Sequence, residues 1–288
     1  MRYIDPILGW YDANARDLPW RAPGATPWGI LVSEIMLQQT PVARVLPVWH
    51  AWMARWPTPA ALAAEPAGEA VRAWGRLGYP RRALRLHETA RAITDGHGGE
   101  VPTSHADLLA LPGIGAYTAA AVASFAFRQR HAVLDTNVRR VLARLVTGVE
   151  HPPKSQTRAE MDLAESLLPA DPPTAARWAV ATMELGALVC TARSPRCTDC
   201  PVLAHCTWHG NGRPAYDGPP RRGQTYAGTD RQCRGRLLAV LREAEGPVEK
   251  PALDIVWPDA VQRERALDGL VADGLVDPLE DGRYALPS

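Results

Sequence analysis

Apolar residues recur every three or four positions through most of the chain, which is the pattern of α-helices with one buried face. Alternation of apolar and polar positions, the pattern of strands, is absent until the last residues. Proline and glycine pairs separate the helical stretches. The clearest stretches are residues 28–39, 81–93, 116–127, 137–146 and 175–189. We therefore predict an all-α body made of many short helices.

The composition changes after residue 209. Residues 210–229 are rich in glycine, proline and arginine and show no periodicity, so we expect a linker. Residues 230–288 then hold three amphipathic stretches and a hairpin signal at Asp281-Gly282. Three helices and a hairpin resemble a winged helix, which binds nucleic acid in some proteins and protein in others. The expected organisation is a helical domain at 1–209, a linker at 210–229 and a winged-helix-like domain at 230–288.

The overall composition excludes some classes of protein. Of the 288 residues, 46% are hydrophobic and 22% are charged, and the net charge of +1 indicates no particular partner. No stretch is long and apolar enough to span a bilayer, and the first twenty residues lack the features of a secretion signal. We therefore expect a cytoplasmic protein with no membrane partner, in a reducing compartment where disulfides are rare.

The pentapeptide LPGIG at residues 111–115 joins a short helical pattern to the stretch 116–127. A Pro-Gly-x-Gly turn between helices is typical of a helix-hairpin-helix motif. Gly113 and Gly115 allow tight backbone turns and leave N–H groups exposed at the start of a helix. Such a turn can bind a DNA phosphate without reading sequence. An ordinary turn between two helices fits the pentapeptide equally well.

Two carboxylates are candidates for acid–base chemistry. Glu34 shares a helix face with Ile30 and Leu31, so burial should raise its pKa and suit it to act as a general acid. The structural alternative is a carboxylate paired with a buried arginine. Asp135 stands directly before a helix, where it either caps the helix or supplies an ionised carboxylate held by backbone N–H groups. Two such groups can cleave a glycosidic bond, one as acid and the other stabilising the sugar cation.

Four of the five cysteines lie within 17 residues, in the stretch CTARSPRCTDCPVLAHC. In a reducing compartment this spacing predicts a metal site with four thiolate ligands. The ligands would be Cys190, Cys197, Cys200 and Cys206. Such a site holds either zinc or an iron–sulfur cluster, and the spacing leaves both open. The fifth cysteine, Cys233, is expected to be a small buried hydrophobic residue.

Several segments between residues 10 and 210 follow the order found in the helix-hairpin-helix DNA glycosylases. They are DLPWR (17–21), SEIMLQQTPV (33–42), LGY (77–79), LPGIGAYTAAAVASFAF (111–127), LDTNVRRVLARL (134–145), MELGALVC (183–190) and the cysteine stretch. Within this superfamily the chain most resembles the MutY family of adenine DNA glycosylases. The resemblance implies two helical subdomains with DNA and an extruded base between them. It also implies a [4Fe-4S] cluster in the cysteine loop, and a monomer that binds double-stranded DNA with a mismatched or damaged base pair, at the nucleoid.

The resemblance also implies roles for single residues. Glu34 matches the general acid that protonates adenine N7, and Asp135 matches the carboxylate that stabilises the sugar cation. Tyr117 and Asn137 match their neighbours in the active site. The adenine pocket would be lined by Leu18, Trp20, Arg21 and Leu37, and the residues entering the base stack would be Gln39 and Tyr79. DNA phosphates would meet Gly113, Gly115, Arg193 and Arg196.

The lysines favour one form of the reaction. Superfamily members that also nick the DNA backbone use a lysine just after the hairpin to form a Schiff base. Tyr117 occupies that position here, and the chain's two lysines, Lys154 and Lys250, lie outside both active-site motifs. We therefore predict a monofunctional glycosylase that hydrolyses the glycosidic bond and leaves an abasic site.

Two of the chain's departures from the family pattern bear on which base it removes. Val180 stands ten residues before the first cysteine, where the family often has Glu or Gln facing the Hoogsteen edge of adenine. The family usually ends in a MutT-like domain, whereas residues 230–288 form a much shorter module. Two alternatives to an adenine glycosylase therefore stay open. One is a pyrimidine glycosylase of the endonuclease III branch, acting on mismatched uracil or thymine or on oxidised pyrimidines, and the other is a non-catalytic DNA-binding iron–sulfur protein.

Overall fold

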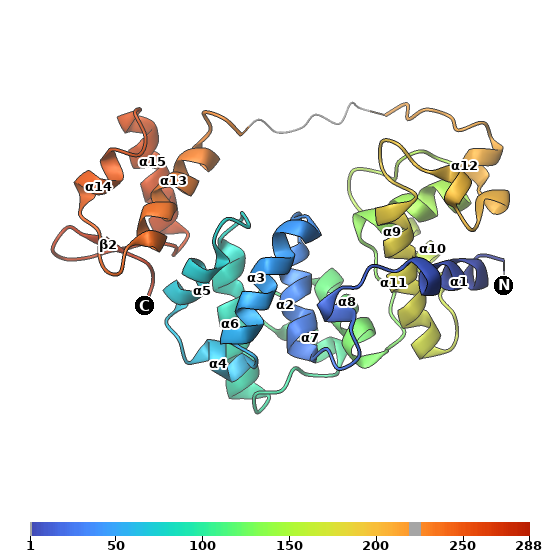
Figure 1. Cartoon of the computed structure of the whole chain (residues 1–288), viewed down its shortest axis with the longest axis horizontal. Helices are drawn as coiled ribbons and strands as arrows, with labels where there is room; N and C mark the ends of the chain where they lie inside the picture. Colours follow the sequence, from blue (N-terminus) through green and yellow to red (C-terminus); the bar gives the residue numbers. More distant parts are fainter. Residues whose placement is uncertain (1, 219–225) are drawn as a thin grey trace. The chain divides into compact units, whose positions relative to one another are not determined.

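The computed structural model describes residues 2–218 and 226–288, and most of these residues are helical (Figure 1). The chain divides into two compact units whose segments interleave along the sequence. The first unit comprises residues 1–30, 103–109 and 115–220, and the second comprises residues 31–102, 110–114 and 221–288. The expected all-α class is confirmed.

The first unit is built around α11. Its helices are α1 (Ile4–Asn14), most of α7 (His105–Ala110), α8 (Ala116–Phe127), α9 (Thr136–Leu142), α10 (Arg158–Leu167), α11 (Pro172–Leu188) and α12 (Thr207–Gly210). Short 3-10 or π-helical turns lie at Pro19–Arg21, Ala143–Thr147, Cys197–Asp199 and Leu203–His205. The helix α11 packs against both α1 and α9, around a core that includes Ile7, Leu145, Trp178 and Leu185 (Figure 1). Asp171 caps α11 by accepting the backbone N–H of Thr174.

The second unit holds a tryptophan core. Its helices are the end of α2 (Pro27–Leu37), α3 (Val42–Arg55), α4 (Pro59–Ala63), α5 (Ala67–Trp74) and α6 (Arg81–Gly96). Trp52 meets both Trp56 and Trp74 edge to face, with ring centroids 4.9 and 5.6 Å apart. All three side chains are buried, and Leu62 of α4 and Leu86 of α6 are buried with them. This packing fixes α6 against α4 and α5.

Residues 230–288, called here the carboxyl-terminal module, also belong to the second unit. The module consists of α13 (Asp230–Glu243), α14 (Lys250–Asp254), α15 (Ala260–Ala272), β1 (Asp277–Pro278) and β2 (Tyr284–Ala285). The two strands pair antiparallel, with Asp277 opposite Ala285. Three helices and a short hairpin are what the sequence predicted for this segment. Cys233 is fully buried in the module, as expected.

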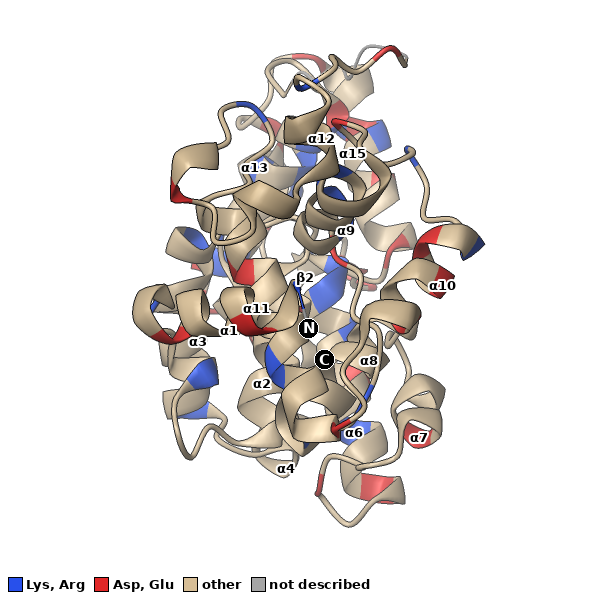
Figure 2. Cartoon of the chain, turned by 90° about the vertical axis from the view of Figure 1, so that its right-hand side faces the viewer, with Lys and Arg blue, Asp and Glu red and all other residues tan. Residues whose placement is uncertain are grey.

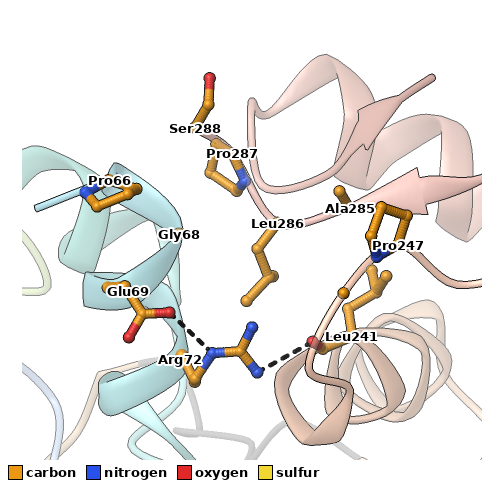
Figure 3. Close-up of a pocket in the computed structure, with 11 residues that line it drawn as sticks. Pro66, Gly68, Glu69, Arg72, Leu241, Pro247, Ala285, Leu286, Pro287 and Ser288 are labelled. Carbon is orange, nitrogen blue, oxygen red and sulfur yellow. Dashed lines mark hydrogen bonds and ion pairs between the residues drawn. The ribbon is translucent and has the colours of Figure 1, made fainter.

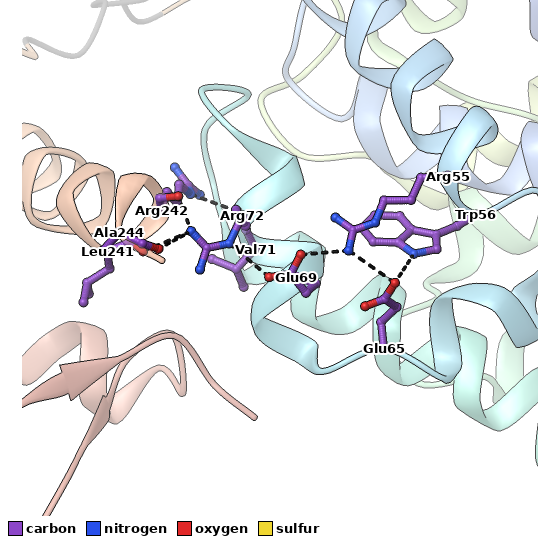
Figure 4. Close-up of polar contacts among 9 residues, drawn as sticks. All are labelled: Arg55, Trp56, Glu65, Glu69, Val71, Arg72, Leu241, Arg242 and Ala244. Carbon is purple, nitrogen blue, oxygen red and sulfur yellow. Dashed lines mark hydrogen bonds and ion pairs between the residues drawn. The ribbon is translucent and has the colours of Figure 1, made fainter. Parts of the chain in front are cut away.

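One arginine of α5 attaches the carboxyl-terminal module to the rest of the second unit (Figure 4). Arg72 donates to the carbonyls of Leu241, Arg242 and Ala244 at the end of α13. These carbonyls have no partners inside their own helix, because the last turn of a helix leaves its acceptors free. Arg72 is itself held by Glu69, with 3.0 Å between Nε and Oε1. A cation therefore caps α13 from outside the module.

The chain end supplies a second attachment (Figure 3). The backbone N–H of Gly68 in α5 donates to the carbonyl of Pro287 at 2.6 Å. A Cβ atom at residue 68 would lie 2.5 Å from that oxygen and 2.8 Å from Cβ of Leu286, so this close approach requires glycine. Together with Arg72 and Glu69, these residues line a shallow pocket between α5 and the chain end.

The expected linker begins in contact with the first unit. The indole N–H of Trp208 donates to the carbonyl of Pro214, and Glu150 accepts the backbone N–H of Tyr216 at 2.7 Å. Residues 219–225 of the expected linker lie outside the described residues. Charged residues of both signs are interspersed over the helices, in keeping with the net charge of +1 (Figure 2). Within the described residues, no helix combines the length and apolar character needed to cross a membrane.

Candidate active site and cysteine loop

Glu34 lies in the middle of α2 and is 6% exposed. The helix starts after Thr26, whose hydroxyl accepts the backbone N–H of Gly29 at 3.0 Å. Ile30 and Leu31, one turn before Glu34, are also buried. The burial expected for Glu34 is therefore confirmed, and its raised pKa stays a prediction.

Asp135 caps α9 and has both carboxylate oxygens occupied. Oδ1 accepts the backbone N–H of Val138 at 2.6 Å, and Oδ2 accepts the side-chain amide of Asn137 at 2.8 Å. Burial raises the pKa of Asp135, whereas these hydrogen bonds and the charge of Arg140 oppose the shift. The sequence predicts the backbone N–H contact but gives no sign of this burial. The helix cap and the ionised carboxylate, first weighed as alternatives, are compatible in this geometry.

A chain of hydrogen bonds runs from Asp135 to the cysteine loop. Asn137 accepts from Arg140 at 2.8 Å, and Nε of Arg140 donates to the carbonyl of Cys190 at 2.7 Å. Arg140 also donates to the carbonyl of Gly186 in α11. A Cβ atom at residue 186 would lie 2.7 Å from Cβ of Asn137, so glycine lets α9 and α11 come close enough for these contacts. The orientation of Asn137 is thereby tied to the first cysteine.

A second buried arginine binds the backbone of the cysteine loop. Arg144 is 1% exposed and donates to the carbonyls of Thr191 and Ala192 at 2.7 and 3.1 Å. It also approaches Sγ of Cys190 at 3.5 Å, and its guanidinium lies 4.6 Å from the ring centroid of Trp208. Arg144 therefore fixes the backbone that follows the first cysteine.

The four cysteines of the loop are free thiols that are half-buried. All five cysteines of the chain lie in the described residues, and each is a free thiol. Cys190, Cys200 and Cys206 pack against the core of the first unit. Burial raises the pKa of the Cys200 thiol to about 11, and the nearby charges of the other three loop cysteines add to this effect. Bound cations are what would keep four clustered thiols deprotonated, because metal ligands of this kind are thiolates.

The arrangement differs from that of a single-ion site. In the described part of the chain, no group of three or more His, Cys, Asp or Glu side chains gathers as one metal ion would require. A cubane cluster makes a different demand, because each of its four thiolates binds a separate iron. Cys190, Cys197, Cys200 and Cys206 would each supply one thiolate.

The two arginines of the cysteine loop are exposed, as phosphate contacts require. Arg196 is partly engaged, since Nη2 donates to the carbonyl of Leu188 at 2.8 Å and Nε lies 3.6 Å from Asp199. These contacts with Leu188 and Asp199 fix the position of the Arg196 side chain. Phosphate binding by Arg193 and Arg196 stays a prediction.

The hairpin at residues 111–115 needs one of its two glycines for conformation. Gly113 has φ +77°, and a Cβ there would lie 2.8 Å from Cβ of Arg85, so both conformation and space require glycine. Gly115 has φ −95° and open space around the position of a Cβ. The prediction that both glycines serve a tight turn is therefore wrong for Gly115, which lies before the first residue of α8. The hydroxyl of Thr89 steadies the turn by donating to the carbonyl of Pro112 at 2.7 Å.

Arg21, predicted to line the adenine pocket, belongs to an ion-pair network that sequence reasoning missed. Glu184 in α11 is fully buried and binds Arg16 and Arg21 at 2.7 and 2.9 Å. Burial raises the pKa of Glu184, but the hydrogen bonds from Arg16 and the charge of Arg21 outweigh it and hold the pKa at about 2. The sequence did hold a signal for this network, because Glu184 is the single carboxylate in the apolar helix predicted at residues 175–189. Glu184 forms the kind of buried carboxylate–arginine pair that was the structural alternative for Glu34.

The remaining predicted residues divide between the two units. Leu18 and Trp20 are buried in the first unit, and Tyr117 packs there against Val133 and Ala179. The predicted site residues of the second unit, in addition to the hairpin's Gly113, are Glu34, Leu37, Gln39 and Tyr79. Their roles stay predictions.

Comparison with known families supports the same reading of the chain. Residues 32–166 match the HhH-GPD superfamily of base excision DNA repair proteins, and residues 190–206 match the iron–sulfur binding domain of endonuclease III. The second match covers the cysteine stretch from its first to its last cysteine. The loop is thus an iron–sulfur site of the [4Fe-4S] type, and the zinc alternative is excluded.

Whole-chain relatives identify the family. The chain is 57% identical to the adenine DNA glycosylase of Mycobacterium tuberculosis (strain H37Rv) over 283 residues, 98% of this chain and 92% of the relative. It is also 57% identical to the adenine DNA glycosylase of Mycolicibacterium smegmatis, over 98% of this chain and 96% of that one. Among solved structures, a thermostable thymine-DNA glycosylase matches with a TM-score of 0.65 at 29% identity, over 72% of this chain and 95% of that one. Identity over nearly the full length, in a helical fold that carries the hairpin and the cysteine loop, shows that this chain belongs to the adenine DNA glycosylase (MutY) family of base excision repair enzymes.

Proposed function

We propose that this protein removes adenine paired with 8-oxoguanine or guanine from double-stranded DNA, by hydrolysis of the N-glycosidic bond. The observation that carries the proposal is the 57% identity to adenine DNA glycosylases over 98% of this chain. The structure supports it with two carboxylates whose surroundings differ, one buried on an apolar helix and one half-buried at a helix N-terminus. Such a pair can divide the roles of acid and anion in one reaction.

Glu34 acts as the general acid and protonates N7 of the extruded adenine, which makes the base a better leaving group. Burial on α2 favours the protonated carboxyl that this step requires. Asp135 then stabilises the positive sugar that remains. Its hydrogen bonds from Val138 and Asn137 favour the carboxylate form, and they also aim both oxygens. Water completes the hydrolysis.

DNA binding uses residues from both units. Gln39 and Tyr79 enter the base stack where adenine leaves, and Leu18, Trp20, Arg21 and Leu37 line its pocket. Val180 in α11 offers no hydrogen bond, so polar reading of the adenine edge falls to other groups of the pocket. The hairpin at Gly113 and Gly115 binds phosphate through backbone N–H groups. The cluster, when bound, ties four thiolates together and so fixes the loop that presents Arg193 and Arg196 to phosphates.

The reaction stops at the abasic site. Tyr117 replaces the lysine that would form a Schiff base, and neither lysine is suited to take over this role. Burial lowers the pKa of Lys250, but its hydrogen bonds to Asp254 and Glu264 outweigh this and raise it, so the amine stays charged and non-nucleophilic. We also propose that the protein acts as a monomer in the cytoplasm, at the nucleoid, where a reducing environment keeps the four thiols available.

A second candidate is excision of a mismatched or oxidised pyrimidine. The structural match to a thymine-DNA glycosylase, at 29% identity, favours it. The two candidates share the fold, but a pyrimidine has no N7 for Glu34 to protonate, so they differ in the base that the pocket accepts and in the role of Glu34. Substrate selection therefore separates them.

The test is single-turnover excision on duplexes that carry A:8-oxoguanine, A:G, U:G, T:G or thymine glycol, with Glu34→Gln beside the parent protein. We expect cleavage at adenine only, at a rate that Glu34→Gln lowers by about a thousandfold. Excision of pyrimidines in place of adenine would establish the second candidate. Strand cleavage without heat or base would contradict a monofunctional enzyme, and no excision from any duplex would overturn both candidates.

A further inference from the structure

Arg82, the second residue of α6, binds two separate turns of the second unit at once. It is 8% exposed, and its contacts were not indicated by any sequence motif. Nη1 donates to the carbonyls of Ile35, Met36 and Gln38 at 2.8, 3.1 and 2.6 Å. Nη2 donates to the hydroxyl of Thr40 and to the carbonyl of Gly78, both at 3.0 Å. One side chain thus joins residues 35–40, at the end of α2, to the turn that precedes α6.

This arginine is a buried charge with neutral partners. Within residues 2–218 and 226–288, no carboxylate forms an ion pair with Arg82. Burial lowers its pKa to about 10, so it still carries its charge at neutral pH. Carbonyls of the last turn of a helix attract a cation, and three of the five acceptors lie at the end of α2. Nη1 and Nη2 make the hydrogen bonds given above, whereas Nε is buried without a hydrogen-bond partner among the described residues. The fold therefore keeps this charge buried at a cost, which points to a role for the arrangement itself.

Both turns contain a residue in a strained backbone conformation. Gln39 has φ +55° and Tyr79 has φ +48°, and they are two of the four described non-glycine residues with positive φ. Tyr79 also precedes Pro80, which further restricts its backbone. Arg82 binds the carbonyl of the residue directly before each of them, Gln38 and Gly78. Strain of this kind persists only where the surroundings impose it, and it gathers at functional sites.

The two strained residues are those assigned above to the opened base stack. Tyr79 is 50% exposed, and its ring centroid lies 5.6 Å from the guanidinium of Arg82, within cation–π range. The guanidinium also lies 5.1 Å from the ring centroid of Trp74, whose indole N–H donates to the carbonyl of Gly78. Trp74 therefore contacts Arg82 on the side of the core, and Arg82 in turn contacts the exposed ring of Tyr79.

We propose that Arg82 is a positioning residue for base extrusion, holding Gln39 and Tyr79 together in the one arrangement that enters the base stack. It does not touch the DNA or the reacting atoms, and it acts through these two residues. This inference rests on the proposed function, because the entry of Gln39 and Tyr79 into the base stack belongs to that proposal. Lysine cannot replace Arg82, since a single ammonium with three donors cannot reach five acceptors on two turns.

The first test measures extrusion separately from chemistry. In the Glu34→Gln protein, 2-aminopurine placed beside the target adenine should brighten when that base leaves the stack. Adding Arg82→Lys should remove most of this rise, whereas Arg91→Gln, on an exposed face of the same helix, should keep it. An unchanged rise in the folded Arg82→Lys protein would overturn the proposal.

The second test varies the cost of leaving the stack. In single-turnover assays with an otherwise parent chain, Arg82→Lys should slow excision about tenfold when G·C pairs flank the target. The loss should be clearly smaller with A·T flanks, because less stacking opposes extrusion. An equal loss with both flanks would show a merely structural role and contradict the inference. Should Arg82→Lys fail to fold, Thr40→Val removes one Arg82 contact and should show the same dependence on flanks, about threefold in size.

A double-mutant cycle then asks whether Arg82 acts through Tyr79. Tyr79→Ala alone should slow excision, and Arg82→Lys should add little to that loss, because its effect passes through the missing ring and turn. Fully additive losses would contradict the inference. If the parent excises another base of the panel and not adenine, the proposed function fails while these comparisons still judge Arg82 on that base. Absence of both excision and brightening with every base would overturn both.

Discussion

The two units hold their functional segments in different ways. In the first unit, Asp135 is connected through Asn137 and Arg140 to the backbone of Cys190, a predicted ligand of the cluster. The same unit buries Glu184, a charged carboxylate held by two arginines. In the second unit, Arg82 holds the end of α2, which carries Glu34, and it does so through carbonyls and one hydroxyl.

This difference separates the conditions to which each unit responds. Thiolate ligands and a buried carboxylate change state with iron supply and with acid, whereas carbonyl acceptors do not titrate. Iron removal and low pH should therefore act first on the first unit. Changes to Arg82, which binds carbonyls of the second unit, should act on that unit and leave the cluster alone.

The largest expected effect is at Glu34, in the unit without a cofactor. Glu34→Gln removes the proton that adenine N7 would receive, so single-turnover excision should fall by about a thousandfold, within the range of general acid catalysis. The absorbance of the cluster and the affinity for duplex DNA should match those of the parent. A rate within tenfold of the parent would remove Glu34 from its assigned role. Loss of cluster absorbance would instead show that the two units are not independent.

The next largest effect concerns acid stability of the first unit. The pKa of Glu184 is about 2 in the folded protein, whereas a glutamate without partners has a pKa of 4.5. The contribution of Glu184 to stability is therefore present above pH 4.5 and fades as the pH falls toward 2. Glu184→Gln should lower the free energy of unfolding by about 3 kcal/mol at pH 7, because two arginines lose their partner. The difference between parent and variant should shrink below pH 4.5 in denaturant titrations. A difference that is constant from pH 3 to pH 7 would contradict the assignment.

Sequence reasoning reached the elements whose signals are local. Periodicity predicted the helices, the hairpin pentapeptide marked a turn, and apolar neighbours correctly placed Glu34 in a buried setting. It also predicted the helices and hairpin of the carboxyl-terminal module. It missed contacts between residues far apart in the chain, such as Arg16 with Glu184 and Arg82 with Gln38. An arginine that binds carbonyls leaves no mark in the sequence, because every residue has a carbonyl and only the fold decides which ones converge.

A smaller effect is expected at Arg140, which links the catalytic carboxylate to the cysteine loop. Arg140→Gln removes the bonds to Cys190 and Gly186, so Asn137 loses its orienting partner. Excision should slow about tenfold, the size expected for one hydrogen bond to a charged group. The cluster should also bleach faster under a chelator, followed by visible absorbance. Arg82→Lys should leave the bleaching rate unchanged. Equal bleaching in the two variants would contradict the difference between the two units.

The smallest effect is expected where the carboxyl-terminal module meets α5. Arg72→Gln removes the cation that caps α13, but its side chain is 32% exposed and the freed carbonyls can bind water, so the loss should be about 1 kcal/mol. Hydrogen exchange should rise in residues 241–244 and stay at the parent level in the cysteine loop. Gly68→Ala should have a similar effect from the other attachment, because its Cβ would meet Pro287. Faster exchange in the cysteine loop of either variant would contradict the independence of the two units, whereas unchanged exchange at 241–244 would show that Arg72 does not hold the module.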